Sequence, residues 1–469
     1  MRLLEALESI NNERLTSFHM PGHKGGRLIG ESLKLFLAYD ITEIPGADNL
    51  HYSESCILDT KIAISEYYGS QMSEILVGGS TVGLISAIMG ATQRGDEILI
   101  NRNAHQSVYN AVELQGLKPY FIAPEFDDRL GIPIGIDSQK LNDRIKNMRA
   151  PKVCVLTYPT YEGICYPIEE LIKACHEAGM VVIVDEAHGA HLKLFGGPFR
   201  SSLELGADIV VQSFHKTLPA MTQTACIHFS KTSRLSGNQM DTILWHLKVL
   251  QTSSPSYVMM ASVDGMLRVL EDQGHEYAEW LKARIEVYYK EVSRFKTLKC
   301  CNLANQDISK IIISIAPGYY DDEHWNCEIL ADQLRNVHRI QVEYATKNMC
   351  LLITSIANED EDFERLEMAL EHIDAEIILR VAHPVHQARL PFGQVYESIS
   401  DPGVHIHKAN EARNMARVKV PVSESIGQIA GEYVIPYPPG IPVIVPGERI
   451  IKESLRLVPE TMKEIYILR

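Results

Sequence analysis

The sequence predicts an α/β protein with a mostly parallel sheet that helices cover on both faces. Three observations favour this fold class. The chain has 469 residues, too many for one ordinary hydrophobic core, and this length favours two or three domains. From about residue 60 to residue 300, apolar runs rich in β-branched residues alternate with helical patterns. These runs are apolar on both faces, as the strands of a buried parallel sheet are.

The expected elements of this stretch follow one another in a regular order. Strands are expected within residues 73–79, 96–103, 118–124, 152–159, 180–190 and 207–216. Helical patterns occupy residues 81–95, 104–116 and 168–179. The first 15 residues of the chain have the pattern of an amphipathic helix. Alternation of this kind is typical of βα units, which build parallel sheets.

The C-terminal third of the chain has a different pattern of expected strands and helices. A helical stretch at 321–337 alternates with expected strands at 310–318, 339–346 and 348–356, which predicts a second, smaller α+β domain. Prolines become frequent after about residue 380. We expect a helix over 420–434 and, because prolines forbid a helix there, a packed extended segment over 435–450.

The predicted organisation has four parts. They are an N-terminal segment (1–60), a large domain (61–300), a small α+β domain (301–380) and a C-terminal domain (381–469).

Composition argues against several classes of protein. The net charge is −15 and no dense Lys/Arg block occurs, so nucleic acid is not an expected partner. No apolar run approaches the roughly 20 residues that a membrane helix needs. The N-terminus lacks the features of a signal peptide, so the cytoplasm is the expected compartment. Nine cysteines without a CxxC pair argue against a disulfide framework and a thiolate zinc site.

Glycines and hydroxyls follow the first expected strand, in the segment GGSTVG at 78–83. Glycines allow backbone amides to approach an anion, and the N-terminus of the following helix adds partial positive charge. Ser80 and Thr81 add hydroxyl donors. The same residues are compatible with a plain helix start, in which Ser80 or Thr81 is the N-cap. The pattern GxxxxGK[ST] is absent, so a nucleotide P-loop is not supported.

Two further strand ends carry an acid and an amine. Asp185 ends an apolar run, where a carboxylate can pair with a protonated pyridine nitrogen, bind magnesium or cap a helix. Lys216 follows 31 positions later in the segment SFHK, one βα unit further along. Consecutive units tend to be neighbours, so the two ends can converge. A lysine with a lowered pKa forms Schiff bases, although an isolated lysine is more often a surface residue.

A histidine stands just past the second expected strand. His105 could stack on the ring of a cofactor, or it could simply begin a helix. Taken together, the four strand ends offer an anion cradle, an imidazole, an acid and an amine. Their order and spacing indicate one flat aromatic cofactor that carries a phosphate.

Eight motifs give the sequence a resemblance to the ornithine/lysine/arginine decarboxylases. They are FHMPGHKGG (18–26), TEIPGADNLH (42–51), GGSTVG (78–83), NRNAHQSVYNA (101–111), YPTYEG (158–163), VDEAHGAH (184–191), SFHKTLPAMTQTA (213–225) and YPPGIPVIVPGE (437–448). The resemblance runs nearly from end to end. It implies the aspartate-aminotransferase-like fold of the type I enzymes that use pyridoxal 5′-phosphate (PLP).

The resemblance also implies roles for single residues around the cofactor ring. Lys216 would bind PLP as a Schiff base, Asp185 would bind its pyridine nitrogen, and His105 would stack on the ring. Ala187 would pack on the opposite face, and His215 would stand beside the lysine. Whether His215 or Lys216 protonates Cα stays open.

Phosphate contacts and assembly follow from the same resemblance. Ser80, Thr81 and Ser213 would hold the phosphate, and Thr252 or Ser253 would reach the phosphate of the neighbouring subunit. The long, acid-induced family members begin with a wing domain that helps to assemble decamers. The PGHK motif starts at residue 21 and leaves no room for such a domain, so a homodimer is expected as the minimal unit.

The implied reaction is the decarboxylation of a basic amino acid, which would feed polyamine synthesis. Arginine is the first expected substrate, because short members are commonly arginine decarboxylases, and lysine and ornithine follow. Candidate carboxylates for the distal cation include Glu424, Glu432 and acidic residues around Asp48, although carboxylates of this kind are more often solvated surface groups. The alternatives are an aminotransferase or aldolase of the same fold and a non-catalytic polyamine-binding relative.

Overall fold

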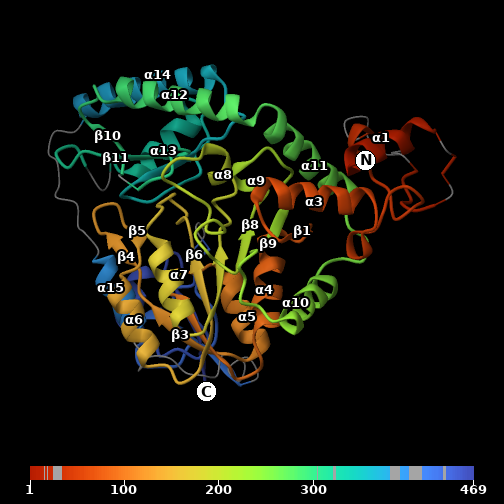
Figure 1. Ribbon diagram of the computed structural model, residues 1–469. Coiled ribbons are helices and arrows are strands. Elements are labelled where there is room, and N and C mark those ends of the chain that lie inside the picture. Colours follow the sequence, from red (N-terminus) through yellow and green to blue (C-terminus); the bar gives the residue numbers. More distant parts are fainter. Residues whose placement is uncertain are drawn as a thin grey trace.

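The computed structural model describes most of the chain, namely residues 1–14, 16–17, 19–24, 34–303, 305–320, 324–380, 391–400, 415–436 and 440–469. Figure 1 shows a central sheet between helices, with α12 and α14 along the top of the molecule and the C-terminus at the bottom. Within the described ranges, no helix combines the length and apolar character that a membrane span requires.

The main sheet has seven strands in the order β1-β9-β8-β7-β6-β2-β3. Their bounds are β1 (Met72–Leu76), β2 (Glu97–Asn101), β3 (Lys118–Ile122), β6 (Pro151–Thr157), β7 (Val181–Asp185), β8 (Ile209–Gln212) and β9 (Ala225–Phe229). All strands run parallel except β9, which is antiparallel to its neighbours β1 and β8. The predicted mostly parallel sheet is therefore confirmed. The sequence pattern does not predict β9, because no helix of ordinary length separates it from β8.

Helices cover both faces of this sheet. One face carries α4 (Gly79–Ala91), α5 (Gln106–Gln115) and α10 (Gly237–Leu250), and the other carries α3 (Cys56–Tyr68), α7 (Ile168–Glu177) and α11 (Tyr257–Asp272). Alternate residues of a strand belong to the two cores: Val153 and Val155 pack on the first face, Cys154 and Leu156 on the second. Burial on both faces explains why the strands read as continuous apolar runs.

A second, antiparallel sheet of four strands follows, in the order β10-β11-β13-β12. Its strands are β10 (Leu298–Cys301), β11 (Lys310–Ile315), β12 (Tyr344–Ala345) and β13 (Cys350–Ile353). The accompanying helices are α12 (Gly274–Val292), α13 (Cys327–Asn336) and α14 (Asp360–Arg380). Helices α12 and α14 lie side by side (Figure 1). The strand expected over 339–346 is reduced to the two residues of β12.

Several short elements complete the fold. They are α2 (Lys34–Leu37), β4 (Glu125–Asp127), β5 (Ile132–Gly135), α6 (Ser138–Lys146), α8 (Leu192–Phe195), α9 (Phe214–Thr217) and α15 (Phe392–Ile399). Strands β4 and β5 form a small antiparallel hairpin.

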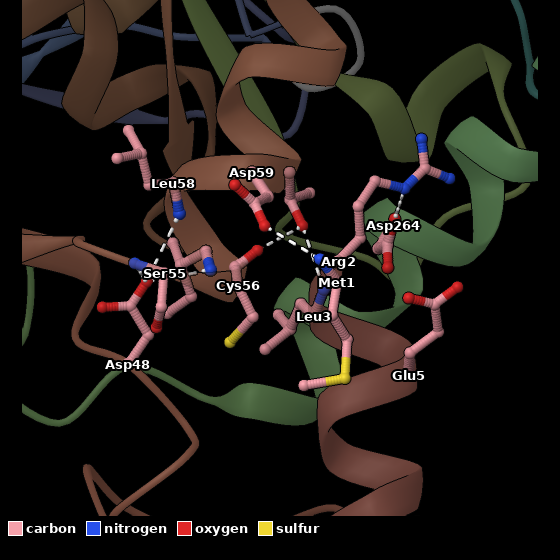
Figure 2. Close-up of polar contacts among 12 residues, drawn as sticks. Met1, Arg2, Leu3, Glu5, Asp48, Ser55, Cys56, Leu58, Asp59 and Asp264 are labelled. Carbon is pink, nitrogen blue, oxygen red and sulfur yellow. Dashed lines mark hydrogen bonds and ion pairs between the residues drawn. The ribbon is translucent and has the colours of Figure 1, made fainter.

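Helix α1 (Leu3–Asn12) realises the expected N-terminal amphipathic helix, and charged contacts fix its start (Figure 2). The amino group of Met1 lies 3.0 Å from Oδ2 of Asp59 in α3. Nε of Arg2 lies 2.8 Å from Oδ1 of Asp264, which is buried in α11. The N-terminal segment is thereby attached to two helices of the second face.

The C-terminal region contains short strands and turns instead of the helix expected over 420–434. Strand β14 (Arg417–Pro421) pairs with β15 (Glu464–Leu468), and a 3-10 turn follows β14 at Val422–Glu424. Gly427 has a φ of +84°, which a right-handed helix does not allow. The backbone N–H groups beyond it donate to other segments, as Ala430 does to Glu448. The segment expected to be extended over 435–450 is not helical where it is described; residues 437–439 lie outside the described part, as do residues 25–26 of the first glycine turn.

A buried ion pair joins the C-terminal region to the main sheet. Arg102 directly follows β2 and is fully buried. Its guanidinium donates to the carbonyl of Pro442 at 2.6 Å and to both carboxylate oxygens of Glu448 at 3.2 Å. This pair holds residues 440–448 against the edge of the sheet where parallel strands end.

Candidate active site

A cavity of about 450 Å³ lies at the carboxyl ends of the parallel strands. Open α/β sheets bind their ligands at this edge. Eight of the residues singled out in the sequence line it: Ser80, Thr81, His105, Asp185, Ala187, Ser213, His215 and Lys216. The second sheet closes the cavity with Glu343 and Ile353. The four strand ends identified in the sequence therefore meet in one place.

Lys216 lies in the short helix α9, directly after β8. Its amine nitrogen is 3.0 Å from Nε2 of His188. Burial lowers the pKa of Lys216, and the negative charges of Asp185 and Glu343 oppose part of this effect. A lysine in such surroundings has more of its neutral, nucleophilic form than a surface lysine has.

Asp185 is the last residue of β7, and its backbone pairs with Val211 of the neighbouring strand β8. The adjacency of these two strands explains why the acid and the amine converge. One oxygen of the carboxylate accepts the backbone N–H of Ala187 at 3.2 Å, which fixes its orientation. Asp185 is 4% exposed, so a cation that meets it does so away from bulk water.

His105 and His215 are the two imidazoles that the sequence placed in the site. Nδ1 of His105 accepts the backbone N–H of Ser107 at 3.2 Å, so the side chain caps α5 while it lines the cavity. Nδ1 of His215 donates to the carbonyl of Thr224 at 2.9 Å. Burial lowers the pKa of both rings, so both are neutral at neutral pH.

The glycine turn before α4 has the features of an anion cradle. Gly79 has a φ of +73°, and neither Ser80 nor Thr81 acts as N-cap, since that position belongs to Gly78 without a side-chain bond. The capping interpretation of these hydroxyls is therefore wrong. In the same cavity, the buried Oγ of Ser213 has no hydrogen-bond partner among the described residues. A buried hydroxyl without a partner, in the same cavity as a helix N-terminus, fits a bound phosphate.

The residues present fit PLP as a whole. The cavity offers an amine for its aldehyde, a carboxylate for its pyridine nitrogen and hydroxyl groups for its phosphate. An imidazole and the small side chain of Ala187 are available for the two ring faces. By contrast, the described residues contain no group of three or more His, Cys, Asp or Glu side chains arranged to hold a metal ion.

Five residues considered from the sequence do not line this cavity, namely Asp48, Thr252, Ser253, Glu424 and Glu432. The carbonyl of Thr252, just after α10, accepts from Nε2 of His51 at 2.8 Å, and its role toward a neighbouring subunit stays a prediction. Glu424 lies in the 3-10 turn after β14, and Glu432 accepts the backbone N–H of Tyr466 at 2.7 Å. The carboxylate of Asp48 accepts backbone N–H groups at the start of α3, including those of Ser55 and Leu58 (Figure 2).

Sequence reasoning missed six polar residues of the site, namely Asn103, Thr157, Tyr161, Glu162, His188 and Glu343. His188, Tyr161 and Glu162 stand in motifs already noted, VDEAHGAH and YPTYEG, which could have drawn attention to them. Glu343 precedes β12, far along the chain, and no local pattern marks it. The rings of Tyr161 and His188 are 4.2 Å apart between centroids, and the hydroxyl of Tyr161 donates to Glu343. These residues therefore form one connected part of the cavity lining.

His188 is held in a neutral form by what surrounds it. Burial lowers its pKa well below the ordinary value, and the positive charges of Lys216 and Lys310 add to the effect. Lys310 belongs to a buried cluster with His191 and Asp307, in which Nε2 of His191 lies 2.8 Å from a carboxylate oxygen. The cluster joins the loop after β7 to the start of β11, and so joins the two sheets.

Glu186 connects the ends of β7 and β8 behind the cavity. It is fully buried, and its carboxylate accepts from Nε2 of Gln212 at 2.7 Å and from Oγ of Ser201 at 2.7 Å. The backbone N–H of Ser202 donates to its second oxygen at 2.6 Å. Burial raises the pKa of Glu186 to about 7, although these donors favour the carboxylate.

Comparison with known proteins relates the chain to one family. The family model "Orn/Lys/Arg decarboxylase, major domain" matches residues 2–325, and "Orn/Lys/Arg decarboxylase, C-terminal domain" matches residues 392–459. An uncharacterised protein of Bacillus subtilis, YaaO, is 33% identical over 94% of this chain and 90% of its own length. The arginine decarboxylase of Halalkalibacterium halodurans is 27% identical, over 94% of this chain and 89% of its own length. The arginine decarboxylase of B. subtilis is also 27% identical, over 97% of this chain and 92% of its own length.

Solved structures of low sequence identity share the fold. The lysine decarboxylase LdcF of Francisella novicida has a TM-score of 0.80 at 19% identity and covers 100% of this chain and 81% of its own. A serine palmitoyltransferase of Sphingomonas wittichii has a TM-score of 0.55 at 15% identity. The match covers 80% of this chain and 84% of the palmitoyltransferase. Together with the mixed seven-stranded sheet, these likenesses confirm the predicted type I fold class.

Proposed function

The chain belongs to the Orn/Lys/Arg decarboxylase family and is a PLP-dependent decarboxylase of a basic amino acid, and we propose that arginine is its preferred substrate. Relatives named arginine decarboxylase are similar to this chain over nearly their whole length. A relative named lysine decarboxylase, from Escherichia coli, is 23% identical, and the match spans 75% of its length. Both the identity and the matched length favour arginine over lysine.

One observation supports the reaction most directly: the amine of Lys216 and the carboxylate of Asp185 stand at the ends of adjacent parallel strands in a single cavity. When bound, PLP supplies an aldehyde that condenses with amines and a ring that takes up the electron pair left by departing CO₂. Among the described residues that line the cavity, Lys216 is the only lysine, and it would be the covalent anchor. The negative charge of Asp185 would keep the pyridine nitrogen protonated.

The imidazoles have separate proposed tasks. His105 would cover one ring face, opposite Ala187. His188, neutral and 3.0 Å from the amine of Lys216, can share a proton at that nitrogen as the lysine changes charge. His215 donates its Nδ1–H to Thr224, so Nε2 of the neutral ring carries no proton. We therefore assign the protonation of Cα to Lys216 and a supporting role to His215.

We also propose a homodimer that forms through the outer face of α10. This helix exposes Trp245, Val249 and Leu250, which are 58%, 55% and 41% exposed. An exposed apolar group of this kind is typical of a subunit interface. Thr252 and Ser253 directly follow α10 and would then be placed to reach the site of the other subunit. Sedimentation of the wild-type protein and of Trp245→Glu tests this: the variant is expected to be monomeric.

The remaining features of the proposal concern cell location and organisation. We propose that the enzyme acts in the cytoplasm, that its amine product feeds polyamine synthesis, and that the domains divide at about residues 60, 300 and 380. The boundary near residue 300 is supported by the two sheets, because the last strand of the main sheet ends at Phe229 and the second sheet begins at Leu298.

A panel of substrates tests the proposed function. The PLP-loaded protein is supplied with arginine, lysine and ornithine, and CO₂ and amine products are measured. We expect equimolar CO₂ and amine, with arginine giving the largest kcat/KM. Formation of a keto acid without CO₂ would favour an aminotransferase, and absence of any turnover would favour a non-catalytic binding protein.

A further inference from the structure

A second cavity, of about 530 Å³, adjoins the first and has a different lining. The two cavities share Asn103, Pro133, Glu162 and Ile441. The second is rich in aromatic rings: Phe126 lies 4.7 Å from Tyr396 and 5.7 Å from Phe392 between ring centroids. Aromatic faces attract organic cations, and they stack well on a planar guanidinium.

Glu162 stands on the wall common to both cavities, and one of its oxygens lacks a partner. The residue is 3% exposed. Its Oε1 accepts the hydroxyl of Tyr344 at 2.7 Å, whereas the buried Oε2 makes no hydrogen bond of ordinary geometry among the described residues, although the Thr160 side chain and the backbone N–H of Glu162 lie near enough to lower the pKa of the carboxyl. Burial raises the pKa of Glu162, as expected for a carboxylate without a cation. A buried acceptor of this kind lowers the free energy of unfolding unless a ligand donates a hydrogen bond to it.

The two glutamates of the first cavity differ in what else they line: Glu162 also lines the second, aromatic cavity, whereas Glu343 does not. The charge of Glu343 acts on Lys216, where the α-carbon of a substrate must react. The charge of Glu162 acts instead on Tyr396 in the second cavity. The distal group of a basic amino acid is several bonds from its α-carbon, so Glu162 is the better placed of the two to meet it.

We propose that Glu162 binds the distal cationic group of the substrate, and that the aromatic cavity behind it admits a side chain as long as that of arginine. The inference rests on the proposed function and deepens it by naming the residue that recognises the cation. The rim of the second cavity carries charges of both signs, Glu328 and Glu460 beside Lys347 and Arg456. The recognition is therefore assigned to the inner wall and not to the rim.

A pair of inhibitors and a matched pair of variants test this assignment. Agmatine carries the distal guanidinium, whereas 1-pentylamine has only an apolar end. Both are measured as inhibitors of PLP-loaded wild type, Glu162→Gln and the control Glu460→Gln. We expect Glu162→Gln to weaken agmatine at least about tenfold and to leave 1-pentylamine within about twofold, because only agmatine loses a charge-assisted hydrogen bond. Glu460→Gln should resemble wild type with both amines.

Other results would overturn the inference. If Glu162→Gln weakens the binding of both amines equally, or leaves the binding of agmatine unchanged, then Glu162 does not bind the distal group. A purely structural role would also lower Tm, whereas we expect Glu162→Gln to melt at the wild-type temperature or above it, since the variant no longer buries an incomplete carboxylate. Should Glu162→Gln fail to fold, Tyr344→Phe, which removes a hydrogen bond that lowers the pKa of Glu162 and so favours its charged form, should still reduce the preference for agmatine over 1-pentylamine. An unchanged preference would contradict the proposal.

Failure of this inference and failure of the proposed function give different results. A wild-type protein that decarboxylates arginine, with no selective effect of Glu162→Gln, refutes only the role of Glu162. A wild-type protein that releases no CO₂ refutes the proposed function. In that case calorimetric binding of agmatine to the wild type and to Glu162→Gln still tests the cation site.

Discussion

The amine of Lys216 lies 3.0 Å from Nε2 of His188, although the two residues come from the ends of different strands. The imidazole has a strongly lowered pKa and is neutral, so the pair carries at most the one positive charge of the lysine. A base that is fixed beside the anchoring amine can orient it and share its proton without adding charge to the cavity.

Replacing His188 by asparagine should therefore slow catalysis without preventing cofactor attachment. The asparagine fills part of the space but cannot exchange a proton with the amine. We expect kcat to fall about 10- to 100-fold, at or below the low end of the range for general acid–base residues, because His188 acts on the amine of Lys216. Steady-state kinetics and borohydride reduction followed by mass spectrometry measure the two effects. A kcat within twofold of wild type would mean that His188 does not exchange a proton with Lys216 during catalysis.

Lys216→Ala should fold and should lose nearly all turnover. Borohydride reduction should add the mass of PLP to the wild-type protein and none to the variant, because the variant lacks the amine that forms the bond. Lys24→Ala is the matched control, since Lys24 is the other lysine within a motif and its amine contacts the carbonyl of His19. The assignment would be contradicted if Lys24→Ala, rather than Lys216→Ala, lost the covalent cofactor.

Asp185→Asn tests the charge that would face the pyridine nitrogen. Asparagine keeps the size of the side chain and can still accept the backbone N–H of Ala187. Loss of the charge should lower kcat by about 10²- to 10⁴-fold, because the ring becomes a poorer electron sink. Circular dichroism should match that of wild type. A kcat close to that of wild type would mean that Asp185 does not face the pyridine nitrogen.

Glu186 should make folding stability depend on pH. Its pKa is raised by burial from about 4.5 to about 7, so its contribution to the free energy of unfolding is fully present below pH 4.5 and is lost as pH rises through 7. The loss is on the order of 3 kcal/mol for a shift of this size. Urea unfolding of wild type and Glu186→Gln between pH 4.5 and 7.5 measures it. Identical slopes against pH in the two proteins would show that Glu186 does not titrate in this range.

The buried pair Arg102–Glu448 should matter far more for stability than a surface pair does. Arg102→Ala removes the guanidinium that forms an ion pair with the buried carboxylate of Glu448, which should cost about 3–5 kcal/mol. Lys419→Ala removes an exposed pair with Glu464, which spans 3.7 Å, and should cost less than about 1 kcal/mol. Denaturant unfolding compares the two variants. Equal effects would mean that Arg102 does not secure the C-terminal region.

The sequence alone was enough to predict the site residues that lie at the ends of parallel strands. Asp185 and Lys216 could be paired because both end apolar runs, and neighbouring βα units place such ends at one sheet edge. The same reasoning located His105 and the glycine turn before α4. In each case a local pattern of about ten residues carries the information about where a strand ends.

The remaining parts of the fold and site depend on contacts between distant segments. Glu343 enters the cavity from the second sheet, and nothing near it in the chain marks that position. Strand β9 pairs with β1, which lies far away in the sequence. The helix expected over 420–434 was wrong because an apolar pattern alone did not reveal the left-handed backbone at Gly427 or the pairing of β14 with β15. Local propensity yields to tertiary pairing in such segments.

The most direct test of the account is the fate of the carboxylate carbon of arginine. The PLP-loaded protein is incubated with arginine labelled at that carbon, and the label is followed in gas and solution. We predict labelled CO₂ and unlabelled agmatine in equal amounts, and neither product from Lys216→Ala. Retention of the label in a keto acid, or equal release by Lys216→Ala, would contradict the claim that this cavity decarboxylates a basic amino acid through Lys216.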